Sequence, residues 1–139
     1  MLFRFGHIRA MNLCAFIVFA LWCMGMYGGW FDVIPQYDKF LHLLGGFTCG
    51  ILGVAMVEAH EFLVALRSIK AYNKALLHAA LVATFWIGGL WEIAEYFIPF
   101  MQDPSGWNFW DTFFDCCADI VGCIIAVLVY RREYHNEFV

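Results

Sequence analysis

The sequence predicts an all-α fold, a four-helix transmembrane bundle formed by a single integral membrane domain over residues 1–139. Three observations predict it. First, 63% of the residues are hydrophobic and only 14% are charged, whereas a soluble domain carries about 25% charged residues. Second, the chain contains four apolar runs, each close to the roughly 20 residues that a helix needs to cross a bilayer. Third, basic residues are largely confined to alternate connections, as in multi-pass membrane proteins.

The four predicted spans differ in the polar residues that they carry. The first contains no charged residue and no histidine. With two arginines before it, it resembles a signal peptide, but its apolar run is longer than the hydrophobic region of a usual signal peptide and it lacks a clean cleavage site, so we expect a retained helix. The second span is interrupted only by His42, and the third and fourth carry acidic residues. The spans cover about residues 10–31, 40–58, 75–98 and 111–130.

The basic residues orient the spans. Seven of the eight Lys and Arg residues fall on one side of the predicted bundle, and only Lys39 falls on the other. Positive residues mark the cytoplasmic side. We therefore expect a multi-pass protein of a bacterial-type inner (plasma) membrane with both termini in the cytoplasm. The seven residues are Arg4, Arg9, Arg67, Lys70, Lys74, Arg131 and Arg132.

Seven ionisable residues lie in or at the edge of the last three spans: Asp38, His42, Glu92, Glu95, Asp111, Asp115 and Asp119. Their spacings of three and four residues place each set on one face of its helix. The orientation puts all three sets in the outer half of the bilayer, with the deeper acids about 6–14 Å from the outer helix ends. Closely connected short helices pack side by side, so the sequence predicts one outward-facing acidic pocket.

Such residues are costly in a membrane and are candidate functional residues for that reason. Lys39 and His42 are too few to balance six acids. Three solutions remain open: protonation of some acids, a water-filled cavity, or a bound divalent cation. Carboxylates with one imidazole suit Zn, Fe or Mn, and carboxylates alone suit Mg or Ca. All seven residues are candidate metal ligands, and His42, Glu92 and Asp119 are candidate catalytic residues.

Other features have simpler interpretations. We expect the six cysteines to be small core residues, and Trp91 to serve in packing. The glycines of the second span allow a neighbouring helix to approach closely. Glu58, His60 and Glu61 read as the solvated end of that span.

Three motifs resemble a known group of proteins. They are Tyr37-Asp38-Lys39-x-x-His42 with Gly45 and Gly46 following, Trp91-Glu92-Ile93-Ala94-Glu95-Tyr96, and Trp110-Asp111-Thr112-x-x-Asp115-x-x-x-Asp119-Ile120-x-x-Gly122. In this order, over roughly residues 37–125, they resemble the VanZ-like and YjdF-type small polytopic inner-membrane proteins, and the YjdF type more closely. The resemblance implies no agreed reaction. Glu95 and Asp119 stand where the VanZ pattern has Gln and Asn, and this departure favours a cation.

The leading functional hypothesis is a carboxylate–histidine metal site in the outer leaflet that acts on a lipid or lipid-linked substrate. In this hypothesis His42 is a ligand or general base, and Asp119 is a ligand or an orienting residue. The alternatives are a non-catalytic structural or accessory subunit with a buried polar network, and a small cation or proton transporter. Expected partners are membrane lipids, further copies of the chain or a larger membrane complex. The chain has no basic patch for nucleic acid.

Overall fold

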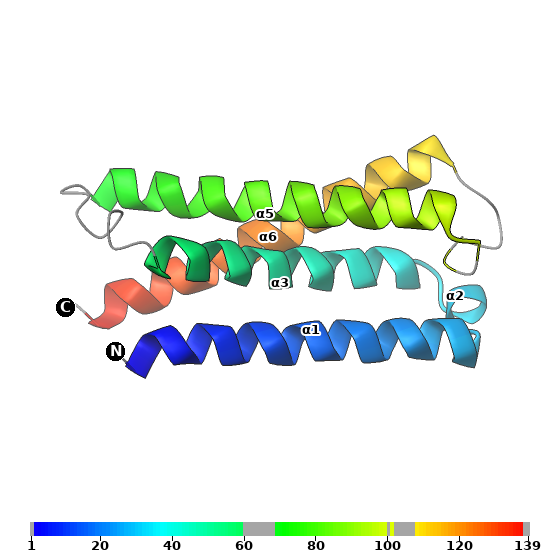
Figure 1. Cartoon of the computed structure of the whole chain (residues 1–139), viewed down its shortest axis with the longest axis horizontal. Helices are drawn as coiled ribbons and strands as arrows, with labels where there is room; N and C mark the ends of the chain where they lie inside the picture. The colour runs from blue at the N-terminus through cyan, green and yellow to red at the C-terminus, as the bar shows by residue number, and fades with distance from the viewer. Residues whose placement is uncertain (1, 60–68, 100, 102–107, 138–139) are drawn as a thin grey trace.

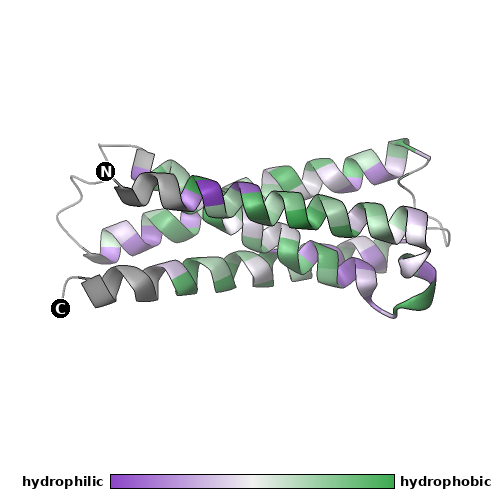
Figure 2. Cartoon of the chain, turned by 90° about the horizontal axis from the view of Figure 1, so that it is seen from below, coloured by the Kyte–Doolittle hydropathy of each residue, from purple (hydrophilic) through white to green (hydrophobic). Residues whose placement is uncertain are grey.

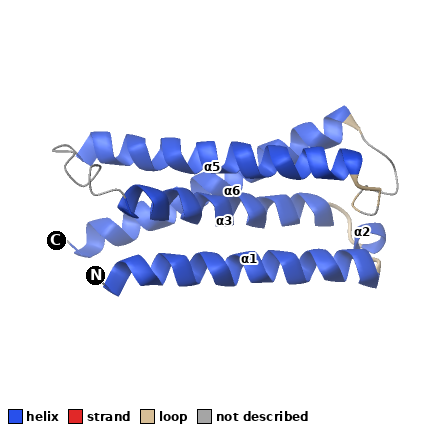
Figure 3. Cartoon of the chain, in the orientation of Figure 1, coloured by secondary structure: helices blue, strands red, loops and turns tan. Residues whose placement is uncertain are grey.

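The computed structural model describes residues 2–59, 69–99, 101 and 108–137. Within these ranges every regular element is a helix (Figure 3), in the order α1, α2, α3, α5 and α6. Four of the helices are long and apolar enough to cross a membrane, over His7–Gly28, Tyr37–Glu58, Lys70–Phe97 and Phe109–Tyr130. The predicted all-α class with four spanning helices is therefore confirmed.

The first helix, α1 (Leu2–Gly28), ends earlier than the sequence suggested. The predicted span continued to residue 31, but Gly29 adopts the left-handed conformation with φ 68° and stops the helix there, as glycine commonly does at helix ends. A short helix, α2 (Trp30–Val33), follows. The aromatic rings of Trp30 and Phe31 then pack edge-to-face against Tyr37. The apolar run thus continues beyond the helix because its last aromatic residues fold back onto the next element.

The central helix is α3 (Tyr37–Ala59), which packs against α1, α5 and α6. Its glycines make these approaches close. A Cβ atom added at Gly50 would lie 2.7 Å from Ala126 Cβ of α6, and one added at Gly53 would overlap the backbone of Ala80 on α5. Gly122 of α6 is pressed in the same way against the α3 backbone. These contacts agree with the packing role predicted for the glycines, because small residues let membrane helices pack backbone to backbone.

The two remaining helices are α5 (Ile69–Phe97) and α6 (Phe109–Glu137). On α6 the buried positions recur at helical spacing along one face, which contacts α3 and α5. The half of the bundle away from the acids has an apolar core whose central members are Val54, Val57, Leu76, Ala80, Cys123 and Val127. All six cysteines are free. Cys49 and Cys123 are buried, in line with the expected core role, but Cys116 is exposed, so the expectation is wrong for Cys116; the other three are half-buried.

Helix α1 is peripheral. Among the described residues its backbone lies against α3 and α2 only, and Figure 1 shows it running beside α3 with α6 crossing obliquely behind. The helix reaches α5 through the ring pair Trp22–Trp91 and α6 through His7–Tyr130. The N-terminal end of α1 and the C-terminal end of α6 lie at the same end of the bundle (Figure 1). Many large hydrophobic side chains on the four long helices are exposed, and hydrophobic stretches occur along each of these helices in Figure 2.

Candidate metal centre

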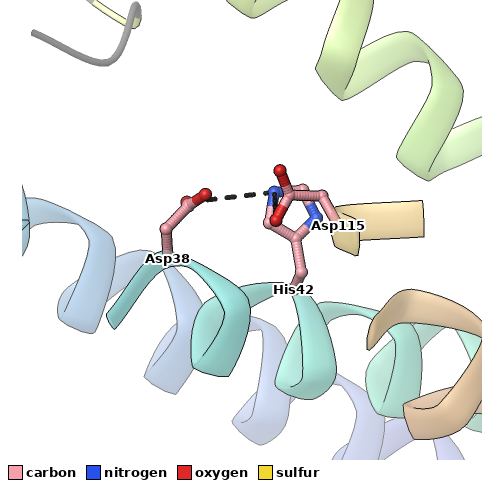
Figure 4. Close-up of side chains that lie close together, drawn as sticks. All are labelled: Asp38, His42 and Asp115. Atoms are coloured by element: carbon pink, nitrogen blue, oxygen red, sulfur yellow. Dashed lines mark ion pairs between the residues drawn. The ribbon is translucent and has the colours of Figure 1, made fainter. Parts of the chain in front are cut away.

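The acidic residues meet at the end of the bundle where α3 begins, α5 ends and α6 begins, which we call the acidic end. His42, one turn into α3, lies at the centre. Its side chain is 5% exposed. Figure 4 shows its ring between Asp38 of the same helix and Asp115 of α6. The acidic cluster consists of His42 and the carboxylates around it: Asp38, Glu92, Glu95, Asp115 and Asp119.

The two ring nitrogens of His42 have different surroundings. Nδ1 lies 3.3 Å from Asp119 Oδ2. When Nδ1 carries the proton, it donates to this carboxylate, and the lone pair of Nε2 is left to face the other acids. A carboxylate behind the imidazole is the usual partner of a metal-ligating histidine, since it fixes the tautomer and the ring orientation. Asp119, predicted as a ligand or an orienting residue, therefore lies in the orienting position.

Asp119 is held in a slot formed by glycines. A Cβ atom added at Gly88 of α5 would lie 2.6 Å from Asp119 Oδ2, and one added at Gly46 of α3 would overlap the Asp119 backbone. Gly45 leaves room beside the other oxygen, with its added Cβ 3.7 Å from Oδ1. No side chain larger than hydrogen fits at Gly46 or Gly88 without displacing this carboxylate. Gly88 could not be recognised from the sequence, because nothing in the sequence indicates which face of α5 meets Asp119.

On its other side, His42 Nε2 faces three carboxylates. The distances are 3.7 Å to Glu92 Oε1, and 3.9 Å to both Asp38 Oδ1 and Asp115 Oδ1. These distances are too long for hydrogen bonds. Two ligands of one ion at 2.0–2.2 Å lie no more than about 4.4 Å apart, so the spacing is compatible with a shared ion. In two groups of three, the possible ligand atoms all lie within 4.8 Å of one another: Asp38, His42 and Asp115, and His42, Glu92 and Glu95.

Glu92 Oε1 is buried and has no hydrogen-bond partner among the described residues. Asp115 Oδ1 also lacks a well-directed hydrogen bond, but it lies 2.6 Å from Lys39 Nζ. That short contact compensates its charge, so we regard only the Glu92 oxygen as unsatisfied. A buried acceptor without a partner is costly, and a cation at this point would remove the cost.

Lys39 forms a second layer of the site, nearer the end of the bundle. Its ammonium lies 2.5 Å from Asp111 Oδ1 and 3.3 Å from Asp38 Oδ2, besides the contact to Asp115. Asp111, predicted as a metal ligand, is thus paired with Lys39 and lies outside both candidate ligand groups. Lys39 was recognised in the sequence only as the one basic residue of this side. The four-residue spacing of Asp111 and Asp115 indicated that they share a face, but not that a lysine bridges them.

Trp91 was expected to serve in packing alone, but it also forms a hydrogen bond. Its indole Nε1 donates a hydrogen bond of 2.6 Å to Glu95 Oε1, and its ring packs edge-to-face against Trp22 of α1 with centroids 5.8 Å apart. The four-residue spacing from Trp91 to Glu95 was the signal that could have revealed this bond. Trp91 therefore holds one carboxylate oxygen of Glu95 in place.

A pocket of about 430 Å³ lies between α1, α3 and α5. Asp38, His42 and Asp119 line one part of it, and the other walls are almost entirely apolar. This pocket could not be predicted from the sequence, because its α1 wall consists of ordinary apolar residues.

The opposite end of α3 differs from its prediction. Glu58 was expected at a solvated helix end, but it accepts a hydrogen bond from Tyr130 of α6 and lies 3.8 Å from His7 of α1. Its side chain is 18% exposed. His60 and Glu61, predicted with it, lie outside the described residues. The sequence could not show this contact, since it depends on how three helices meet.

These features define a multi-pass helical membrane protein with a buried acidic and histidine cluster at one end. The chain belongs to the family described as "Predicted membrane protein (DUF2238)", which matches residues 1–136. It is also similar to a Thermotoga maritima protein that bears the name "Uncharacterized protein", with 28% identity over 123 residues. The match covers 83% of this chain and 58% of that relative's length. No solved structure matches the chain. The narrower resemblance to VanZ-like and YjdF-type proteins stays a prediction.

Proposed function

We propose that the acidic cluster binds a divalent metal ion and presents it to a lipid or lipid-linked substrate in the outer half of the membrane. His42 Nε2, Glu92, Glu95 and Asp38 are the proposed ligands, and Asp119 orients the imidazole. The observation that carries the proposal is the position of His42. One ring nitrogen lies against Asp119, while the other faces three carboxylates at 3.7–3.9 Å without a hydrogen bond.

The charges support a cation. Six acids gather around His42 and Lys39, but only three of them lie against the Lys39 ammonium, and several of these side chains are deeply buried. Uncompensated buried charge is strongly unfavourable. Imidazole with carboxylates suits Zn, Fe or Mn, and Mg is served by the carboxylates. Because Lys39 already pairs with Asp38, Asp111 and Asp115, the ligand group of His42, Glu92 and Glu95 is the better supported of the two.

Such an ion would polarise an ester or phosphoryl oxygen, or lower the pKa of a bound water. The residues around it would supply orientation and proton acceptance. Asp119 holds the His42 ring in place, and Trp91 fixes Glu95. Asp115, whose Oδ1 lies 3.9 Å from His42 Nε2 and is held by Lys39, would be near enough to the ion to accept a proton from a water bound there.

The side of the membrane is also part of the proposal. Six of the eight basic residues lie in helix segments at the end opposite the acids, near the start of α1, the start of α5 and the end of α6, which supports a cytoplasmic location for that end. Both chain ends lie there as well (Figure 1). The acidic end would then face the outside of a bacterial-type inner membrane.

A second candidate function is a non-catalytic structural subunit, and the contacts of Lys39 favour it. One ammonium within 3.3 Å of three carboxylates is a self-contained ion network. Proton sharing among the remaining acids would complete it. A transporter is less well supported, because the apolar core that includes Val54, Leu76 and Val127 closes the other half of the bundle, and a through-path needs polar lining.

Elemental analysis of the full-length protein tests the proposal. The protein is purified without chelator and without a histidine tag, alongside Glu92→Gln and the control Asp32→Asn. Asp32 is an exposed acid of α2, outside the cluster. We expect near-stoichiometric Zn, Fe, Mn or Mg in the unmodified protein and in Asp32→Asn, and a clear loss in Glu92→Gln. A metal-free unmodified protein would overturn the proposal in favour of the structural network. A metal retained by Glu92→Gln would show that the ligands are others.

A further inference from the structure

The pocket of about 430 Å³ extends from the acidic cluster far into the bundle. On α3 its lining runs from Asp38 to Leu52, and on α1 from Trp22 back to Met11. Fourteen residues of helix correspond to about 21 Å, which exceeds the roughly 15 Å of hydrocarbon in one leaflet of a 30 Å core. The pocket is thus long and parallel to the spanning helices.

Its shape and walls select an apolar chain. The volume lies within the roughly 300–1,000 Å³ of ligand pockets. Away from the acidic cluster, the lining side chain with a hydroxyl is Thr48, and that hydroxyl already donates to the Leu44 carbonyl. Apart from the weakly donating thiol of Cys49, the long part of the pocket therefore offers no free side-chain donor to a polar ligand.

The pocket is also placed for entry from the bilayer. The backbone of α1 lies against α3 and not against α5 among the described residues. Between α1 and α5, therefore, only side chains separate the pocket from the outside of the bundle. Trp22 and Trp91 meet there near the acidic cluster, and both line the pocket. Trp91 also holds Glu95, and two proposed ligands, Asp38 and His42, line the pocket, so the pocket adjoins the proposed ligand group.

We infer that this pocket holds one acyl chain of a membrane lipid whose headgroup lies at the acidic cluster and carries no net negative charge. The inference rests on the proposed function, since it names the substrate class of the same site. The chain follows from the apolar length of the pocket. The headgroup follows from the surplus of acids, which exceeds the charge of Lys39 and one divalent ion together. The field of such a site repels anionic headgroups and favours an ammonium group.

Photolabelling tests the inference. The full-length protein is reconstituted in phosphatidylcholine vesicles that contain a trace of phosphatidylethanolamine with a diazirine at the end of one acyl chain. After illumination, the labelled residues are identified by mass spectrometry. We expect label on the deep walls of the pocket, at Met11 and Leu52, above the level on lipid-facing residues of α6 such as Leu128, which is 55% exposed. Label spread evenly over the lipid-facing residues would overturn the inference.

Matched variants separate the pocket from the general membrane surface. Ala15→Phe fills the pocket from α1, whereas Ala10→Phe makes the same change at an exposed position of α1 outside it. Ile87→Trp and Ile93→Trp form a second pair on α5, with Ile87 lining the pocket and Ile93 outside it. The pocket-filling variants should lose most of the deep label and the controls should keep it. Unchanged deep label in Ala15→Phe and Ile87→Trp would contradict the inference.

A second photolabelling experiment tests the charge of the headgroup. Phosphatidylglycerol with the same photoreactive chain should label the pocket less than the ethanolamine lipid. Equal or stronger labelling by the anionic lipid would overturn the headgroup assignment.

Metal content measured on the same samples distinguishes failure of the inference from failure of the proposed function. Deep labelling in a metal-free protein would support the acyl-chain pocket and contradict the metal site. A metal-loaded protein without deep label would contradict the acyl-chain pocket and support the metal site. Because Ala15→Phe and Ile87→Trp alter no proposed ligand, both should keep their metal.

Discussion

Helices α3 and α6 build two different interiors along one continuous contact. At the acidic end they bury His42, Asp115 and Asp119. In the other half, the same faces bury apolar residues such as Val54, Cys123 and Val127. Glycines bring the two backbones together in both halves. Close packing is therefore common to both, and the chemistry of the buried side chains is what differs.

This difference indicates that the apolar half stabilises the bundle and that the acidic half serves function. In the apolar half, burial stabilises the bundle through packing, since lipid tails and core side chains are equally apolar. In the acidic half, burial of charge is unfavourable unless a partner neutralises it. The acidic half is retained at a cost, and such sites in membranes are usually functional.

The largest effect is expected from His42→Ala. The change leaves Asp119 and Asp115 buried without the imidazole, and breaking a buried pair costs about 3–5 kcal/mol. We expect a lower free energy of unfolding in detergent and no bound metal. His78→Ala is the control, because His78 is an exposed histidine of α5 outside the cluster. Equal behaviour of the two variants would show that the acidic end does not depend on its histidine.

A smaller effect is expected in the apolar half from Leu76→Ala. Leu76 is 1% exposed and belongs to the apolar core. Core truncations in soluble proteins cost roughly 2–5 kcal/mol. In a membrane the truncation loses packing contacts but no hydrophobic burial from water, so we expect a loss of unfolding free energy near or below the lower end of this range. Leu77→Ala, at a 39% exposed neighbour, should change the unfolding free energy little. Metal content should stay unchanged in both, and a loss of metal in Leu76→Ala would contradict the separation of the two halves.

The smallest effect on stability, with a selective effect on metal, is expected from Gly88→Ala. The added methyl group would press on Asp119 Oδ2 and disturb the carboxylate behind His42. Loss of such an orienting partner typically lowers metal affinity about 10–100-fold. Gly89→Ala is an exact neighbour control, since a Cβ there meets nothing within 4 Å. Metal titration by calorimetry measures the difference, and equal affinities for the two variants would remove Asp119 from the site.

Much of this architecture could be predicted from the sequence. Span number followed from apolar run length, and the acids could be placed at one end because basic residues orient the helices and helical spacing sets each face. The end of α1 was missed, since Trp30 and Phe31 continue the apolar pattern after Gly29 has stopped the helix. The placement of Lys39, Gly88 and the pocket depends on how each helix is rotated about its axis. One sequence does not contain that rotation.

The central claim is that a metal ion bound through His42 neutralises the acidic end. The most direct test is the free energy of unfolding of the metal-free protein as a function of added Zn²⁺ or Mn²⁺. A ligand that binds only the folded state stabilises it by about 2.7 kcal/mol at one hundred times its dissociation constant. The account predicts a rise of this kind in the unmodified protein and none in His42→Ala. An unfolding free energy that does not respond to any of the proposed metals would contradict it.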